Sequence, residues 1–122
     1  MSEVGSKRIL VVEDDDTIRD LITEILQSAG YRVERASDGL QALVKVSVSR
    51  PDIIVLDLMM PVMDGWTFLE HFRKNPECSG TPVVVTSAYH TPSKTARELP
   101  VQAFLAKPFD MDTLVGVVER LL

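Results

Sequence analysis

The chain alternates short apolar runs with longer helical patterns, and this alternation strongly limits the folds that it can adopt. Four of the runs are continuous, three of these are rich in β-branched residues, and a fifth run alternates apolar with charged residues. The runs span residues 9–12, 31–36, 53–56, 83–85 and 104–106. Continuous runs are typical of strands that are covered on both faces, and the alternating run at 31–36 is typical of an edge strand.

Helical patterns fill most of the intervals between these runs. Apolar residues repeat at helical spacing in residues 17–29, 39–49, 66–74 and 110–122. Within 39–49 the repeat consists of Leu40, Leu43, Val44 and Val48. Gly30 is typical of a helix end, and Asp15 or Asp16 is a candidate N-cap for the first helix.

The interval before the last strand carries the weakest helical pattern. Pro92 and Pro100 bracket residues 93–99, which contain few apolar positions and give at most about two turns. We therefore expect a fourth helix that is short or irregular. With this helix, strands and helices alternate about five times, which predicts an α/β domain with a doubly wound parallel sheet.

Length and composition set further limits on the chain. Its 122 residues fit one domain, for which we expect a core at about 7–122 and a disordered tail at 1–6. The net charge of -5 and the lack of basic clusters argue against binding to nucleic acid. The single cysteine, Cys78, excludes an intramolecular disulfide and fits a reducing cytoplasm. No apolar run is long enough to cross a bilayer, so we expect a cytoplasmic protein without a membrane partner.

Acidic residues follow two of the predicted strands. Glu13 and Asp14 come directly after the first run, and Asp57 follows the third. The carboxyl ends of parallel strands meet at one edge of a sheet, so we expect these carboxylates to converge if the strands are neighbours. Clustered carboxylates repel one another unless a cation joins them, and oxygen ligands with room for water suit Mg²⁺. The sequence therefore predicts a magnesium site at this edge.

The last two strands bring a hydroxyl and an ammonium group to the same edge. Ser87 lies at the end of the fourth strand and supplies the hydroxyl, for which Thr86 is the alternative. Lys107 closes the fifth strand. Phosphoryl transfer chiefly needs positioning and neutralised charge, which a divalent ion and a lysine supply around a nucleophile such as Asp57. Each residue taken singly has a plainer interpretation as a cap, a turn or a surface group. Complementary groups at four strand ends favour the functional interpretation.

These residues resemble the receiver domains of bacterial two-component response regulators along nearly the whole chain. The matching segments are residues 9–15, 57–61, 63–65, 87–88 and 107–109. Each fragment is weak by itself, but their order and spacing are highly specific. The resemblance implies a flavodoxin-like fold with five parallel strands in the order 2-1-3-4-5 and five helices, of which the fourth is short or irregular.

The resemblance also implies roles for the acidic residues. Asp57 is then the phosphoacceptor, which takes a phosphoryl group from the phosphohistidine of a sensor histidine kinase or from a phosphotransfer protein. Asp14 binds Mg²⁺ directly and Glu13 binds it through water, while the backbone carbonyl of Met59 and Asp57 complete the protein ligands. Glu13 departs from the aspartate that is more frequent in the family.

The remaining implied roles belong to the later strands. Ser87 binds a phosphoryl oxygen and acts in the switch, Lys107 matches the family's lysine, and its bond to Pro108 is typically cis. Phe104 matches the aromatic switch residue. Because this ring has no hydroxyl to desolvate, we expect it to lie inward even without phosphate. Gly65 matches a glycine for which a positive φ or close packing is expected.

Signalling is expected to pass through the surface around the fourth and fifth helices and the fifth strand to a downstream protein that the sequence does not identify. Residues 99–103 replace the family's usual Gly-Ala pair, which places this output surface in question. We expect a monomer or a weak phosphorylation-dependent dimer, and no enzymatic activity beyond the domain's own phosphorylation and dephosphorylation. The chain is either a stand-alone regulator or a receiver from a longer protein.

Three other functions compete with this interpretation. A phosphatase of the haloacid dehalogenase type also uses a strand-end aspartate and Mg²⁺, but it needs a second acid where this chain has Met59. An interaction module that has lost phosphorylation is disfavoured by the intact acidic residues and lysine. A flavodoxin-like cofactor binder needs a phosphate loop rich in serine, threonine and glycine, and none follows the first strand.

Overall fold

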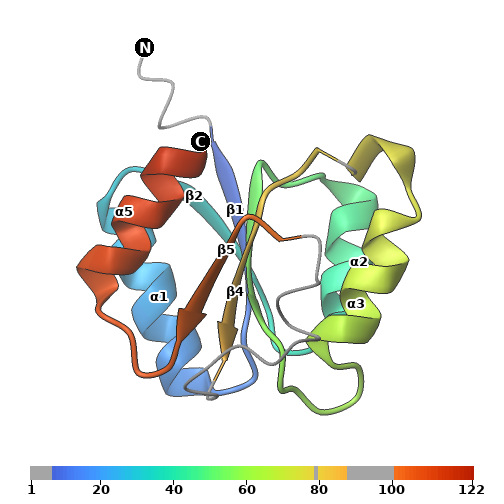
Figure 1. The fold of residues 1–122 in the computed structure, drawn as a ribbon, viewed down its shortest axis with the longest axis horizontal. Coiled ribbons are helices and arrows are strands. Elements are labelled where there is room, and N and C mark those ends of the chain that lie inside the picture. The colour runs from blue at the N-terminus through green and yellow to red at the C-terminus, as the bar shows by residue number, and fades with distance from the viewer. Residues whose placement is uncertain (1–6, 79, 88–100) are drawn as a thin grey trace.

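A parallel sheet between two layers of helices forms the fold in the computed structural model, which describes residues 7–78, 80–87 and 101–122 (Figure 1). The strands are β1 (Arg8–Val12), β2 (Arg32–Ala36), β3 (Ile53–Asp57), β4 (Val83–Ser87) and β5 (Ala103–Ala106). The helices are α1 (Asp16–Ser28), α2 (Gly39–Val48), α3 (Gly65–Arg73) and α5 (Met111–Leu121), with a short 3₁₀-helix at Pro76–Cys78. The predicted helix at 93–99, its flanking prolines and the tail at 1–6 lie outside the described residues.

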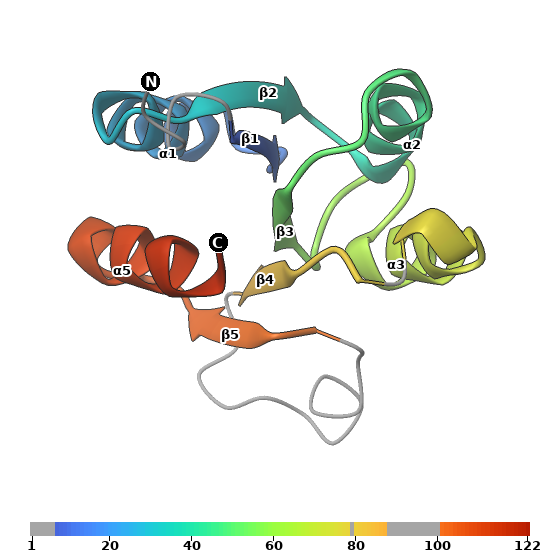
Figure 2. The same cartoon turned by 90° about the horizontal axis from the view of Figure 1, so that it is seen from above.

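The strand order is β2-β1-β3-β4-β5, and all pairs are parallel. Helices α1 and α5 cover one face of the sheet, and α2 and α3 cover the other (Figure 2). The predicted doubly wound sheet is confirmed, as is the edge position of the strand whose residues alternate in polarity. That strand, β2, carries three charged side chains, and all of them are exposed.

The core consists of two clusters, one on each face of the sheet. Successive residues of a strand point to opposite faces, so Ile9 and Val11 join the cluster under α1 and α5, while Leu10 and Val12 join the cluster under α2 and α3. Because helices cover both faces, β3 is buried along its whole length. This double burial explains why the strand runs are continuous rather than alternating.

Local sequence signals fix both ends of α1. The Asp15 carboxylate accepts a hydrogen bond from the Ile18 N–H at 3.0 Å, so Asp15 rather than Asp16 is the N-cap. At the other end Gly30 adopts a φ of 100°, and its N–H donates to the Gln27 carbonyl at 3.0 Å. The Tyr31 N–H donates to the Leu26 carbonyl at 3.2 Å, which completes a Schellman motif.

Helix α2 has the predicted period but not the burial that its apolar pattern suggests. Ala42 is fully buried, and Leu43 and Val46 pack against the core. Three of the four residues in the predicted repeat point outward instead, since Leu40, Val44 and Val48 are 51%, 59% and 83% exposed. The helix is apolar on both sides, so the sequence pattern by itself did not determine which side faces the sheet.

Candidate functional site

The predicted acidic residues meet at the carboxyl ends of β1 and β3. The two strands pair in register up to Val12 and Leu56, so the residues that follow them emerge side by side. Carboxylate oxygens of Glu13, Asp14 and Asp57 lie within 4.8 Å of one another. Glu13 is 1% exposed and Asp57 is 3% exposed, whereas Asp14 is exposed at the mouth of the site. The structure therefore forms the acidic cluster that strand-end reasoning predicted.

Lys107 joins this cluster from the end of β5. Its Nζ donates a hydrogen bond to Glu13 Oε1 at 2.6 Å and lies 3.4 Å from Asp57 Oδ2. The lysine side chain is 18% exposed, so the ammonium group is largely withdrawn from water. Its shortest contact is with Glu13, and it partly neutralises both buried carboxylates. The bond between Lys107 and Pro108 is cis, as the sequence resemblance implied.

Burial and like charge raise the pKa of the Asp57 carboxyl group to about 7. Desolvation is the largest cause, and the negative charge of Glu13 adds to it. The positive charge of Lys107 and the Met59 N–H, which donates to Asp57 Oδ1 at 3.1 Å, act in the opposite direction. Contact with Asp14 raises the pKa further. One ammonium group is therefore not enough to hold this cluster of acids fully ionised.

Burial and the neighbouring carboxylates also shift the pKa of Lys107, and they act on it in opposing directions. Burial by itself would lower the pKa of the ammonium group, but the hydrogen bond to Glu13 and the charges of Asp57 and Glu13 raise it above its ordinary value. Lys107 therefore stays positively charged at neutral pH. It is a cation in direct contact with Asp57 and Glu13.

Hydrogen bonds from the start of α1 fix the loop that carries the acidic pair. The Asp15 N–H donates to Glu13 Oε2 at 3.1 Å, and Arg19 Nη1 donates to the Glu13 carbonyl oxygen at 2.9 Å. The Arg19 side chain is only 15% exposed and also pairs with Asp16. Sequence reasoning missed Arg19, because an arginine three residues after an aspartate on a helix usually forms only a surface ion pair. Its contact with the backbone of Glu13 depends on how α1 packs.

Gly65 allows α3 to begin directly against the end of β3. A Cβ atom at this position would lie 2.8 Å from the Asp57 carbonyl oxygen and 2.8 Å from Leu58 Cα, closer than a side chain permits. The Gly65 N–H donates to the Leu58 carbonyl at 2.9 Å. Of the two expectations for this glycine, close packing is confirmed. The glycine thus holds the loop from Asp57 to α3 close to the site.

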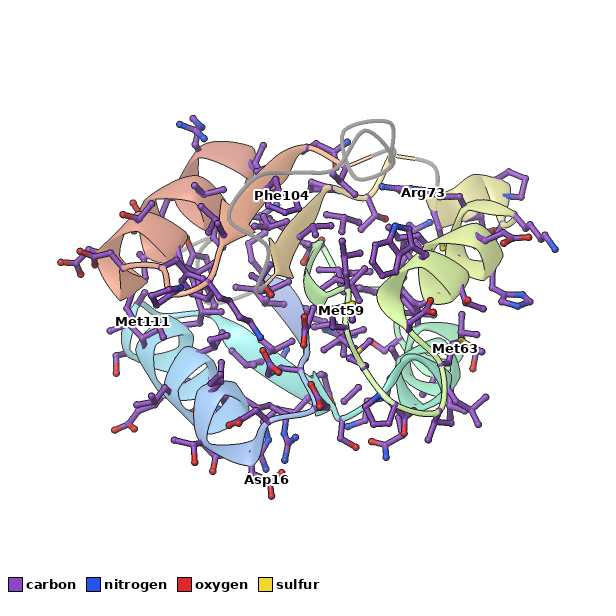
Figure 3. All side chains as sticks on the ribbon, turned by 60° about the horizontal axis from the view of Figure 1, so that its bottom comes forward. Asp16, Met59, Met63, Arg73, Phe104 and Met111 are labelled. Carbon is purple, nitrogen blue, oxygen red and sulfur yellow. The ribbon has the colours of Figure 1, made fainter. Side chains whose placement is uncertain are left out.

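Met59 lies in this loop, near the middle of the carboxyl-end face of the molecule (Figure 3). Its backbone N–H contacts Asp57, and its side chain is 49% exposed. The residue is therefore adjacent to the acidic cluster. The ligand role of its carbonyl group stays a prediction.

The sequence pattern of the response regulator receiver domain family matches residues 9–119. The chain belongs to this family. It is 37% identical over 119 residues to the response regulator MprA of Mycobacterium ulcerans, covering 96% of this chain and 50% of that protein. The chain spans about half the length of the curated relatives it matches.

Solved receiver structures share the fold along nearly the whole chain. The chemotaxis response regulator CheY4 of Vibrio cholerae matches with a TM-score of 0.89 and 35% identity, covering 95% of this chain and 98% of that one. The response regulator TrrA from Thermotoga maritima, in complex with Mg²⁺-BeF, matches with a TM-score of 0.85 and 32% identity, covering 95% and 99%. Membership of the receiver family places the chain in neither the haloacid dehalogenase nor the flavodoxin cofactor group.

The two residues for which the sequence resemblance implies a switch role, Ser87 and Phe104, lie on β4 and β5. Ser87 is the last residue of β4 and pairs with Ala106, and its side chain lies outside the described part of the structure. Its rival Thr86 pairs with Asp57 and is 1% exposed. Phe104 is half-buried and packs against the cluster under α2 and α3. Its fully inward position stays a prediction.

In the part of the receiver domain that the structure describes, no helix combines the length and the apolar character needed to cross a membrane.

Proposed function

We propose that this receiver domain accepts a phosphoryl group on the Asp57 carboxylate from the phosphohistidine of a sensor histidine kinase or of a phosphotransfer protein. The observation that carries the proposal is the burial of Asp57 at a strand end, beside Glu13 and Asp14 and with the Lys107 ammonium group in contact with both Asp57 and Glu13. Membership of the receiver family supports it.

The residues present fit a magnesium ion. Three carboxylates supply the hard oxygen ligands that Mg²⁺ prefers, and the exposed Asp14 leaves one side open for water and phosphate. Asp57, with a pKa of about 7, needs additional positive charge to be fully ionised at neutral pH. We propose Asp14, Asp57 and the Met59 carbonyl as direct ligands, with Glu13 acting through water. When bound, the ion neutralises these carboxylates and the charge on the transferred phosphoryl oxygens.

The transfer requires little covalent chemistry from the protein. A carboxylate oxygen of Asp57 forms a bond to phosphorus as the bond from phosphorus to the histidine nitrogen breaks, and the ring nitrogen keeps the electron pair. Lys107 can then exchange part of its contact with Glu13 for the new phosphoryl oxygens, because its Nζ already lies 3.4 Å from Asp57. We assign the Ser87 hydroxyl to another of these oxygens.

Phosphorylation in this proposal changes the surface around β5, α5 and Phe104, where a downstream protein binds. Lys107 directly follows β5, so a shift of its ammonium group toward the phosphoryl oxygens would be transmitted to that strand. The proposal includes a monomer or weak phosphorylation-dependent dimer in the cytoplasm, to which the free thiol of Cys78 is suited. The domain promotes only its own phosphorylation and dephosphorylation.

The direct test is to incubate the protein with acetyl phosphate and Mg²⁺ and to measure its intact mass. We expect the wild type to gain one phosphoryl group, and Asp57→Asn to gain none. Asp52→Asn is the matched control, because Asp52 lies just before the amino end of the same strand and away from the cluster. This control should be phosphorylated like the wild type.

Two outcomes would contradict the proposal. Equal phosphorylation of wild type and Asp57→Asn would place the acceptor elsewhere. No phosphorylation of the folded wild type by acetyl phosphate or by a phosphohistidine donor would favour an interaction module that has lost this chemistry.

A further inference from the structure

The outward side of α2 carries an apolar stripe that nothing in the described structure covers. Leu40, Val44 and Val48 are spaced four residues apart, so they lie on one side of the helix, and each is more than half exposed. We call these three residues the outer stripe. A helix that is apolar on both sides is normally covered on both, and a contiguous exposed apolar patch commonly marks an interaction site.

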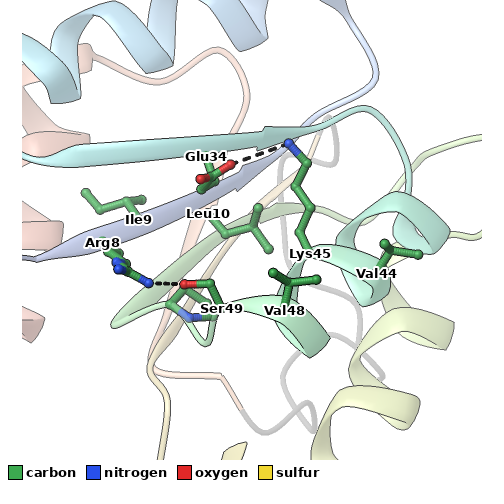
Figure 4. Close-up of a pocket in the computed structure, with 9 residues that line it drawn as sticks. Arg8, Ile9, Leu10, Glu34, Val44, Lys45, Val48 and Ser49 are labelled. Carbon is green, nitrogen blue, oxygen red and sulfur yellow. Dashed lines mark hydrogen bonds and ion pairs between the residues drawn. The ribbon is translucent and has the colours of Figure 1, made fainter.

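A pocket of about 180 Å³ lies beside this stripe, between α2 and the first residues of β1 (Figure 4). Its walls are mostly aliphatic and include Ile9, Leu10, Val44, Val48 and Pro51. The pocket extends to the edge strand β2, where Glu34 lines it. A concave aliphatic site of this size suits one large apolar side chain from a partner.

The rim of the pocket is basic, although the whole chain has a net charge of -5. Arg8 and Arg32 are register partners on β1 and β2, so they lie on the same face of the sheet. Among the described residues neither guanidinium group forms an ion pair, and Arg8 donates instead to the neutral hydroxyl of Ser49. The Arg8 backbone N–H, rather than its side chain, binds Asp52. The Arg8 guanidinium group, which lines the pocket, and that of its register partner Arg32 therefore have no carboxylate partner among the described residues.

One acidic side chain at the rim is already engaged. Glu34 pairs with Lys45 at 3.5 Å, and both side chains are substantially exposed. This contact does not offset Arg8 and Arg32. The site thus combines an aliphatic pocket, an apolar stripe and an excess of positive charge.

We propose that the outer stripe and its pocket bind an acidic amphipathic helix of a partner protein. Apolar residues of that helix pack along Leu40, Val44 and Val48, and one of them enters the pocket. Its flanking Asp or Glu side chains bind Arg8 and Arg32, because a guanidinium group binds a carboxylate through two parallel hydrogen bonds. This surface lies on α2, on the far side of the sheet from α5 (Figure 2). Its pocket adjoins the first residues of β1, whereas the acidic cluster follows the carboxyl ends of β1 and β3.

Two other occupants are less favoured by charge and shape. A second copy of the chain placed stripe against stripe would bring the same basic rims together, and three side chains bury too little area for a stable dimer. An anionic membrane surface matches the basic rim, but it leaves the concave pocket without a specific function.

The test is a selection of helical peptides against the folded protein. A phage-displayed library of helices of about 16 residues is long enough to span the stripe at about 1.5 Å per residue. We expect the enriched peptides to repeat apolar residues at positions i and i+4, with Asp or Glu beside them. Chemical-shift mapping of one such peptide should then perturb α2 and the start of β1.

Variants measured with that peptide separate the apolar from the charged contribution. Val44→Asp should weaken binding about tenfold or more, and Arg8→Gln about threefold to tenfold. Leu21→Asp on α1 is the apolar control, because Leu21 is 49% exposed on the other face. Arg35→Gln is the charge control, because Arg35 is paired with Asp20 on the opposite face of β2. Both controls should change binding by less than about twofold.

Three results would overturn the proposal. The first is a selection that enriches no peptides, or only peptides that map elsewhere. The second is sedimentation showing a wild-type dimer that Val44→Asp dissociates, which would make a second copy the occupant. The third is binding to phosphatidylglycerol vesicles that Val44→Asp abolishes, which would assign the surface to a membrane. Thermal unfolding of each variant verifies that the substitution leaves the fold intact.

Discussion

The two ends of β1 depart from ordinary protein burial in opposite ways. Beyond its carboxyl end, Glu13 is buried together with Asp57, and both carboxylates contact the ammonium group of the largely buried Lys107. At its amino end, Arg8 borders an aliphatic pocket, and the apolar side chains of α2 beside it are exposed. Buried polar groups and exposed apolar patches are the informative exceptions to the usual distribution, because burying a charge costs stability and an exposed apolar patch often marks an interaction site.

The difference between the two ends indicates how each of them binds. At the carboxyl end Lys107 is already paired with Glu13, so a phosphoryl group that binds Lys107 there replaces part of this contact. At the amino end Glu34 pairs with Lys45 and Arg8 donates to Ser49, but the Arg8 and Arg32 side chains have no carboxylate partner among the described residues. The carboxyl-end site is therefore preorganised for a small charged group, and the amino-end surface suits a larger apolar partner.

The largest stability effect is expected for the removal of the buried cation. Lys107→Met leaves Glu13 and Asp57 buried without it, so we expect the free energy of unfolding to fall by about 3 kcal/mol at pH 8 in the absence of Mg²⁺. Denaturant unfolding measures this loss. Lys45→Met is the matched control at the exposed pair, where about 0 to 1 kcal/mol is expected. Equal losses in the two variants would remove the contrast between the two ends.

A smaller effect is expected from the pH dependence of Asp57. Its pKa of about 7 in the folded protein is raised above the unfolded value of about 3.9, so the folded state binds more protons between these values. The free energy of unfolding should therefore fall as the pH rises from about 4 to about 7, by an amount on the order of 2 kcal/mol relative to Asp57→Asn.

Denaturant unfolding of both proteins at several pH values, with a chelator present, measures this difference. Mg²⁺ should reduce it, because a bound cation relieves the repulsion between the ionised carboxylates. Parallel stability curves for the two proteins would show that burial of Asp57 carries no such cost. The contrast with the amino end would then rest on Lys107 alone.

The smallest effect is expected on the outer stripe. Val44→Thr adds a hydroxyl to an exposed position, so the free energy of unfolding should change by less than about 0.5 kcal/mol. Val83→Thr makes the same change at a buried position of the core, where about 1 to 3 kcal/mol should be lost. A comparable loss at Val44 would mean that the outer stripe contributes to folding, and it would weaken its assignment as a binding surface.

Much of the fold could be predicted because local chemistry and burial pattern agree along most of the chain. The continuous apolar runs of β1 and β3 predicted strands covered on both faces, and the mixed run predicted the edge strand β2. Gly30 and Asp15 act at the ends of α1 through their own backbone freedom and side-chain oxygen, which are properties of single residues. Such signals need no knowledge of the neighbours in space.

The candidate site was partly predictable for a different reason. Parallel strands deliver their carboxyl ends to one edge, so the meeting of Glu13, Asp14 and Asp57 followed from the order of elements. The contact of Arg19 with the Glu13 carbonyl did not follow, because it depends on the angle at which α1 packs. The same holds for Lys107, whose Nζ lies 2.6 Å from Glu13 but 3.4 Å from Asp57, a difference that depends on how β5 is placed against β1 and β3.

The sequence by itself determined the strand and helix order, the helix ends and the collection of charged groups at one edge. The elements and their ends follow from backbone preferences and from the period of apolar residues, which act within a few positions along the chain. The shared edge follows from the order of elements, because parallel strands end at the same edge of a sheet. Only the tertiary structure decided which side of α2 is buried, and so left Leu40, Val44 and Val48 in water. A helix that is apolar on both sides can place either side against the sheet. Contacts with the sheet and with α3, which are far from α2 in sequence, determine which side is buried.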